Sequence, residues 1–228
     1  PGSGQFSKAL PAARLFARLI PARAVGGDLY EVIALPDGRF FVAVGDVSDK
    51  GIPAALLMAR VMTLAKLLVP TSRDLGLLAS VLNTQLEEGN AESMFTTLFG
   101  AIVDPRTSEV RCVSAGHNPP VLVRKSGASL IEVDSGRPLG LFEGSPYVEA
   151  TFRLEPGERL VLYTDGVTEA WDKDRNEFGE DRLVALLERT GLAGSGEDLG
   201  NAILSEVSAF AGEAPQSDDI TVLVIDRT

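Results

Sequence analysis

The sequence predicts an α+β fold in which two mainly antiparallel sheets are flanked by helices. Short apolar or alternating runs, bounded by Gly, Pro, Asn and Asp, recur along the 228 residues and are typical of antiparallel strands. Four longer segments with helical periodicity occur as two pairs along the chain. A chain of this length, 45% hydrophobic, can bury a sizeable core. Two sheets packed face to face with helices outside would bury all of these apolar faces.

Residues 1–11 are predicted to be a linker or a cloning remnant, because they begin with Pro1-Gly2-Ser3-Gly4. No later linker is long enough to require a second domain, so residues 12–228 are predicted to form a single domain. Within it, the imperfect alternation of residues 13–20 predicts the first strand, ended by Pro21.

A hairpin that carries two aspartates follows. Two β-rich runs are joined by Pro36-Asp37-Gly38, a sequence suited to a tight turn. If Leu35 pairs with Arg39 across this turn, the same register places Asp28 opposite Asp46, with Cβ atoms roughly 5 Å apart. Like charges placed opposite one another are destabilising, so this arrangement indicates either a cation between them or one protonated carboxyl. The alternative is that both aspartates simply face water at the strand ends.

The next helix is expected over residues 54–69, with Ser48 or Asp49 as its cap and Pro53 in its first turn. Its polar stripe is narrow, which predicts a core helix buried on most sides. The stretch is interrupted by charges and is too short to span a bilayer. Its polar residues are Arg60, Thr63 and Lys66.

The rest of the chain continues this pattern. A second helix over 74–88 has one apolar face, and the final strand is expected over 220–225. Between them the sequence predicts, in order, a hairpin of 94–104 and 109–114, strands at 121–124 and 130–133, an exposed loop at 136–146, strands at 150–154 and 159–164 joined by Pro156-Gly157, a polar lid or recognition loop at 171–180, and helices at 181–189 and 198–211.

Composition limits the partners and the compartment. The net charge of −11 and pI near 4.6 argue against nucleic acid or an anionic membrane surface, since both need a basic face. A single cysteine, Cys112, cannot form an intrachain disulfide and sits in an apolar run, so it is expected in the core of a cytoplasmic protein. No signal peptide is visible.

A second acidic pair lies far along the chain. Asp165 follows one predicted strand, and Asp218 and Asp219 precede its expected antiparallel neighbour, so these carboxylates should also lie side by side. An oxygen-rich site without a His or Cys cluster favours Mg²⁺ or Mn²⁺. His117, the only histidine, is expected to hydrogen-bond within its loop and not to bind metal. A metal pair of this kind would activate water for attack on a phosphoryl group.

Six motifs in this order resemble the SpoIIE/RsbU-type phosphatases, the bacterial branch of the metal-dependent type 2C (PPM) protein Ser/Thr phosphatases, over about residues 12–227. The motifs are Val25-Gly26-Gly27-Asp28, Gly45-Asp46-Val47-Ser48, Gly51-Ile52-Pro53-Ala54-Ala55-Leu56-Leu57-Met58, Ser114-Ala115-Gly116-His117-Asn118-Pro119-Pro120, Thr164-Asp165-Gly166-Val167-Thr168-Glu169 and Asp218-Asp219-Ile220-Thr221.

The resemblance implies an α-β-β-α sandwich with two Mn²⁺ or Mg²⁺ ions at one end of the sheets. It implies that Asp46 bridges both ions and that the Val47 carbonyl binds one of them. Asp219 stands where the wider family has Asn and is a second choice as ligand. The remaining ligands, direct or through water, would be Asp28, Asp165 and Asp218.

The reaction implied is hydrolysis of phosphoserine or phosphothreonine by metal-activated water, on a STAS-type anti-anti-sigma factor in partner-switching signalling. A family member is normally controlled by an upstream sensor domain or coiled coil, often as a homodimer, and neither region is in this chain. Two departures from the pattern stand out. Asp49 replaces the usual Gly, although Asp tolerates left-handed backbone angles. Ser48 stands where eukaryotic relatives have a His, which leaves the general acid unassigned.

Two alternatives belong to other classes. One is a pseudo-phosphatase, an output domain that binds a regulatory partner without turnover; the intact acidic positions argue against it. The other is a two-metal nuclease or nucleotide hydrolase, and the acidic charge and lack of a basic groove count against that one.

Overall fold

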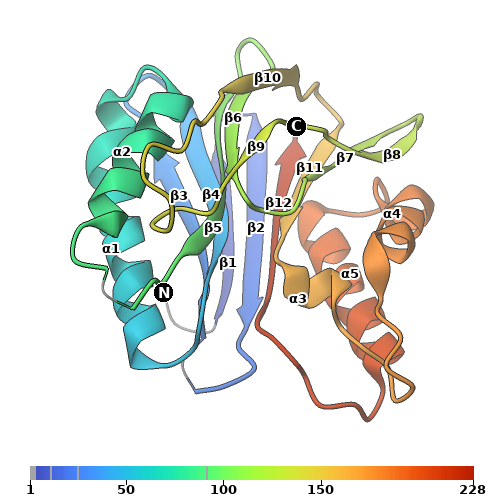
Figure 1. Cartoon of the computed structure of the whole chain (residues 1–228). Coiled ribbons are helices and arrows are strands. Elements are labelled where there is room, and N and C mark those ends of the chain that lie inside the picture. Colours follow the sequence, from blue (N-terminus) through green and yellow to red (C-terminus); the bar gives the residue numbers. More distant parts are fainter. Residues whose placement is uncertain (1–3, 11, 25, 91) are drawn as a thin grey trace. The chain divides into compact units, whose positions relative to one another are not determined.

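The computed structural model describes residues 4–10, 12–24, 26–90 and 92–228, which form two compact units (Figure 1). One unit comprises Pro1–Arg23, Asn118–Ile131 and Leu154–Thr228, and the other comprises Ala24–His117 and Glu132–Arg153. We call them the terminal unit and the central unit. Each has its own mainly antiparallel sheet and its own helices, so the predicted α+β class with two sheets and flanking helices is confirmed.

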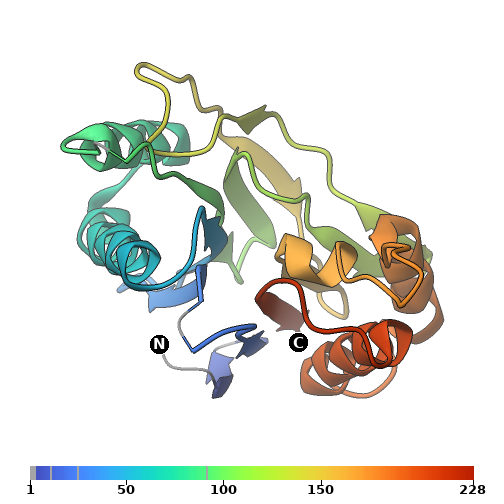
Figure 2. The same ribbon diagram turned by 60° about the horizontal axis from the view of Figure 1, so that its bottom comes forward.

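The sheet of the terminal unit has the strand order β1-β2-β12-β11-β7-β8. Helices α4 and α5 lie beside this sheet (Figure 2), and their apolar residues join Phe16, Val161 and Val224 in one hydrophobic cluster. The elements are β1 (Gly4–Leu10), β2 (Ala13–Ile20), β7 (Val121–Arg124), β8 (Gly127–Leu130), β11 (Arg159–Tyr163), α3 (Asp165–Thr168), α4 (Gly179–Thr190), α5 (Gly196–Ala211) and β12 (Ile220–Arg227).

The sheet of the central unit has the order β10-β6-β5-β4-β3, and β9 pairs with β6 in parallel. Helix α2 buries the apolar face that its periodicity predicts. The elements are β3 (Asp28–Ala34), β4 (Phe40–Val47), α1 (Ile52–Leu68), a 3₁₀ turn (Val69–Thr71), α2 (Leu75–Glu87), β5 (Thr96–Asp104), β6 (Glu109–Ala115), β9 (Ser135–Gly136) and β10 (Ala150–Arg153).

Several expectations need correction. Residues 4–10, inside the stretch predicted as linker, form β1 and pair with β2, while residues 1–3 and 11 lie outside the described part. The strand expected at 130–133 lies earlier in the chain: β8 spans Gly127–Leu130 and pairs with β7 across the turn at residues 125–126, so that Leu130 is opposite Val121, the first residue of β7. β10 and β11 do not form a hairpin: β10 pairs with β6 and β11 with β12 and β7.

Helix α1 differs most from its prediction. Its N-cap is Gly51, at φ +91°, with no side-chain cap bond, so neither Ser48 nor Asp49 caps it. Only one face packs against the rest of the unit, and Ile52 and Leu56 are 73% and 67% exposed, so the helix is not buried on most sides.

By length and composition alone, Ile52–Thr71 could cross a membrane: it has 20 residues and a mean hydropathy of 1.8, with 22% buried. The helix is therefore long enough to cross a bilayer, and the expectation that this stretch is too short is wrong. Length and composition are weak evidence for a membrane span, because helices of ordinary domains pass the same test. Here Ala54, Val61 and Ala65 belong to the hydrophobic core of the central unit together with α2.

Candidate functional site

The first pair of aspartates lies at the open end of the β3–β4 hairpin. Leu35 donates its N–H to the Arg39 carbonyl at 2.8 Å, which closes the turn as predicted. From there the antiparallel register runs without a bulge to Asp28 opposite Asp46. The predicted juxtaposition of these two carboxylates across the hairpin is therefore confirmed.

Oxygen atoms converge beside Gly27. A Cβ atom at this position would lie 2.6 Å from the Val47 carbonyl oxygen, 3.1 Å from Asp46 Oδ1 and 3.3 Å from the Asp49 carbonyl oxygen. Only a residue without a side chain fits there, and Val25 of the same motif lies outside the described residues. Carboxylate and carbonyl oxygens of this kind are the donors that Mg²⁺ and Mn²⁺ prefer, so the residues present fit a hard cation.

Two threonines of β5 hold the main chain of Asp46. The Thr96 hydroxyl donates to the Asp46 carbonyl at 2.9 Å, and the Thr97 hydroxyl accepts from the Asp46 N–H at 3.3 Å. Thr97 Oγ1 also lies 2.9 Å from Nδ1 of His117. The side chain of His117 is therefore hydrogen-bonded to β5 and not within its own loop as expected, and through Thr97 this bond leads to Asp46.

The turn after Asp46 keeps its shape despite the missing glycine. Asp49 adopts φ +65°, the left-handed conformation that glycine adopts most easily and that Asp also tolerates. Ser48 exchanges hydrogen bonds with Phe95: the Ser48 N–H donates to the Phe95 carbonyl, and the Phe95 N–H donates to Ser48 Oγ, both at 2.8 Å. In the described structure Ser48 therefore anchors this turn to the start of β5.

The second pair of aspartates lies in the terminal unit, where β11 pairs with β12 as predicted. The Thr164 N–H donates to the Thr221 carbonyl at 3.1 Å, which extends the pairing by one residue toward Asp165. Asp165 then opens the short helix α3. A Cβ atom on Gly166 would collide with the Asp219 carbonyl, so a glycine is required after Asp165.

Glu169 is a further acidic residue next to this pair in the sequence and is affected by its charges. Its pKa is raised by desolvation and by the negative charges of Asp165, Glu177 and Asp218. Asp219 is 1% exposed, and its Oδ1 accepts the Ala22 N–H at 2.7 Å. One oxygen of the second-choice ligand is therefore used to hold the chain that leaves β2.

The two pairs belong to different units. Asp28, Asp46 and Val47 lie in the central unit, whereas Asp165, Asp218 and Asp219 lie in the terminal unit. Among the residues that the structure describes, no group of three or more His, Cys, Asp or Glu side chains is placed to hold a metal ion. The assignment of all six residues to metal binding remains a prediction.

Comparison with known families shows which family the chain belongs to. Residues 36–228 match the family model described as Stage II sporulation protein E (SpoIIE). The chain belongs to the SpoIIE family. Two relatives of this SpoIIE-family chain are Protein IcfG of Synechocystis sp. and phosphoserine phosphatase RsbU of Bacillus subtilis, each 27% identical over 91% of the chain. The chain spans 37% of the length of IcfG and 61% of that of RsbU.

Solved structures share its fold. The RsbU and RsbW domains of a Mycobacterium tuberculosis protein superpose with a TM-score of 0.81 at 24% identity, over 99% of this chain and 63% of that one. RsbX in complex with magnesium gives a TM-score of 0.74 at 16% identity, over 99% of this chain and 100% of that one.

Three further residues of this SpoIIE-family chain interact with the candidate ligands or their neighbours, and their roles were not predicted from the sequence. Glu169 was quoted within a motif but not as part of the acidic group. Thr97 and His117 were not connected with Asp46, because their link is a contact between β5 and the loop after β6. A signal for Glu169 did exist: it is one helical turn after Asp165.

Proposed function

We propose that residues 4–228, which include β1, form one metal-dependent protein Ser/Thr phosphatase domain, acting in the cytoplasm on a phosphoserine or phosphothreonine of a STAS-type anti-anti-sigma factor. Membership of the SpoIIE family supports this proposal, as does similarity to RsbU, a phosphoserine phosphatase. The pairing of RsbU and RsbW domains in a structural relative favours a partner-switching substrate. In the longer protein we propose control by an upstream sensor or coiled coil, with a homodimer as the working form.

The observation that carries the proposal is the group of oxygens around Gly27, next to the Asp28–Asp46 pair. We propose that Asp46 and the Val47 carbonyl would hold Mn²⁺ or Mg²⁺, and that Asp46 would serve both ions. The other ligands would be Asp28, Asp165, Asp218 and, as second choice, Asp219. A structural relative binds magnesium, which favours this choice of ion. When bound, two such ions polarise a phosphoryl group and supply a nucleophilic water.

The protein's own groups have distinct tasks in this proposal. Thr96 and Thr97 fix the main chain of Asp46. Little free energy would therefore be spent on reorienting Asp46 when an ion binds. The Gly27 backbone leaves space beside that carboxylate. The Asp49 carbonyl, also directed at this space, is held by the left-handed turn.

Hydrolysis of p-nitrophenyl phosphate with Mn²⁺ or Mg²⁺ tests the proposal. Asp46→Asn should lower kcat/KM about 100-fold or more, because a ligand to the ions is weakened. Asp37→Asn is the matched control: Asp37 lies in the same hairpin, at its exposed turn, and should keep full activity. Activity retained in excess chelator would contradict the proposal. Calorimetric titration that shows no metal binding would favour the pseudo-phosphatase instead.

A further inference from the structure

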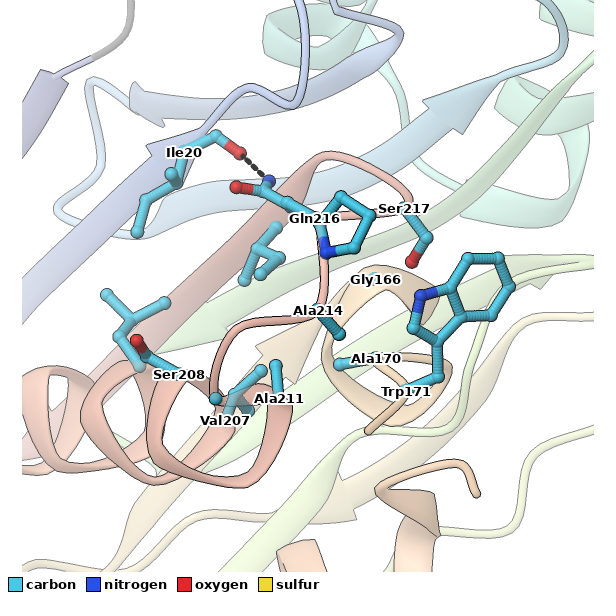
Figure 3. Close-up of a pocket in the computed structure, with 14 residues that line it drawn as sticks. Ile20, Gly166, Ala170, Trp171, Val207, Ser208, Ala211, Ala214, Gln216 and Ser217 are labelled. Carbon is cyan, nitrogen blue, oxygen red and sulfur yellow. Dashed lines mark hydrogen bonds between the residues drawn. The ribbon is translucent and has the colours of Figure 1, made fainter. Parts of the chain in front are cut away.

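A cavity of about 200 Å³ opens in the terminal unit (Figure 3). Its walls come from α3 and the residues after it, from α5, from the loop 212–217 and from the start of β12. The inner wall is apolar and includes the buried side chains of Leu204, Val207 and Ile220. An apolar cavity of about 150 Å³ is large enough for benzene, so this one can receive a leucine- or phenylalanine-sized side chain.

Two residues that line the cavity are sequence neighbours of proposed metal ligands in this unit. Gly166, in its wall, follows Asp165, and Ser217, also in its wall, precedes Asp218. Neighbouring Cα atoms are about 3.8 Å apart, so a group held in the cavity lies within a few residues' reach of these carboxylates. A phosphoserine at the proposed ions would therefore bring its flanking residues to this cavity.

The rim can hold a peptide as well as a side chain. Trp171 lies at the rim close to Ser217 in Figure 3, and Ser208 adds a hydroxyl. Gln216 stiffens the loop, because its Nε2 donates to the carbonyls of Ile20 at 2.9 Å and Asp218 at 2.7 Å. The loop that forms one wall is thus fixed directly to the residue proposed as a ligand.

Charged residues of both signs adjoin the lining in the sequence. Lys173 and Arg175 follow Trp171, and the Arg175 guanidinium stacks on the Trp171 ring, 5.0 Å from the ring centre. The acidic neighbours are Asp165, Glu169, Asp172, Glu213 and Asp218.

From these observations, and resting on the proposed phosphatase function, we infer that this cavity is a specificity subsite. It binds one apolar side chain of the phosphoprotein substrate, within about three residues of the phosphoserine. Burial of a leucine side chain contributes enough binding to change kcat/KM by roughly 10- to 100-fold.

Phosphoserine heptapeptides test the inference. In a Lys- and Ala-containing parent, leucine is placed in turn at each position on either side of the phosphoserine, and kcat/KM is measured with Mn²⁺. One leucine position should raise kcat/KM about tenfold or more. Ala211→Phe, at the half-buried end of α5 in the cavity wall, should remove that preference. Ala209→Phe, exposed on the same helix and outside the wall, should retain it. Circular dichroism checks that both variants fold.

Binding provides a second readout that needs no turnover. Trp171 is the only tryptophan of the chain, so its fluorescence reports occupancy of the cavity. The preferred leucine peptide should change this emission in the wild type and not in Ala211→Phe. No leucine preference and no fluorescence change would overturn the subsite even if the peptides are hydrolysed. Fluorescence binding without hydrolysis of any peptide or of p-nitrophenyl phosphate would uphold the subsite and overturn the phosphatase.

Discussion

Asp28 and Asp46 lie opposite one another because a regular β ladder runs from a tight turn to the end of the hairpin. Asp165 and Asp218 depend on irregular structure: a single-turn helix after β11, and the loop that precedes β12. In the first case strand register alone sets the separation of the carboxylates. In the second case several specific contacts must hold the chain, above all the close approach of Gly166 to the Asp219 carbonyl. The second pair should therefore be easier to disrupt.

The largest expected effect compares the two glycines. Gly166→Ala should lower the free energy of unfolding by about 3 kcal/mol, because the new Cβ collides with the backbone of Asp219. Gly27→Ala should cost less, about 1–2 kcal/mol, since its closest contact would be 2.6 Å from the Val47 carbonyl oxygen. Urea denaturation measures both.

Gly157→Ala separates a clash from backbone strain. Gly157 has φ +85°, and a Cβ atom on it would meet no other atom within 4 Å, so the variant should lose about 1 kcal/mol from strain alone. If Gly166→Ala were no more destabilising than Gly157→Ala, the tight packing of α3 on the loop before β12 would not matter for stability.

The next prediction compares the roles of two neighbouring residues, Asp218 and Asp219, in stability and activity. Asp219→Ala should destabilise the protein by about 1–3 kcal/mol, because it leaves the Ala22 N–H without its buried acceptor. Asp218→Ala should change stability less, since Asp218 is only partly buried, yet it should abolish most phosphatase activity. Thermal unfolding and p-nitrophenyl phosphate hydrolysis distinguish the two; equal losses of stability in both variants would contradict the division of roles.

The difference between the pairs also explains how far the sequence could predict the site. Pro36-Asp37-Gly38 defines a turn, and strand alternation then carries the register to Asp28 and Asp46 without tertiary information. The β11–β12 pairing was likewise expected from two apolar runs. Local pattern says nothing of contacts between distant segments, so the Thr97–His117 contact and the Asp219–Ala22 bond were not foreseen.

Helix α1 shows the converse error. Its apolar composition predicted burial, but composition does not specify which faces find a partner, and Ile52 and Leu56 remain exposed. The cap was missed for a related reason: Gly51 reverses the chain through a positive φ, so Ser48 is directed to Phe95 and not to the helix.

A smaller effect is expected when the hydrogen bonds from β5 to Asp46 of the β3–β4 hairpin are removed. Thr97→Val removes the hydroxyl between Asp46 and His117 and should weaken Mn²⁺ binding about tenfold, with a loss of stability near ~1 kcal/mol. Thr151→Val is the matched control, because Thr151 is exposed on β10 of the same sheet. Calorimetric titration with Mn²⁺ measures the affinity, and unchanged affinity in Thr97→Val would show that register alone positions Asp46.

The smallest expected effect concerns the left-handed turn after Asp46. Asp49→Gly should raise stability by about 0.5 kcal/mol, because glycine adopts φ +65° without a Cβ penalty. Ser93→Gly, at φ +53° and exposed before β5, should gain a similar amount with no change in Mn²⁺ affinity. Asp49→Asn keeps the backbone preference and removes only the charge, so any change of affinity shared by Asp49→Gly and Asp49→Asn belongs to the carboxylate. A change confined to Asp49→Gly would instead show that the strained turn itself sets the position of the Asp49 carbonyl beside Gly27.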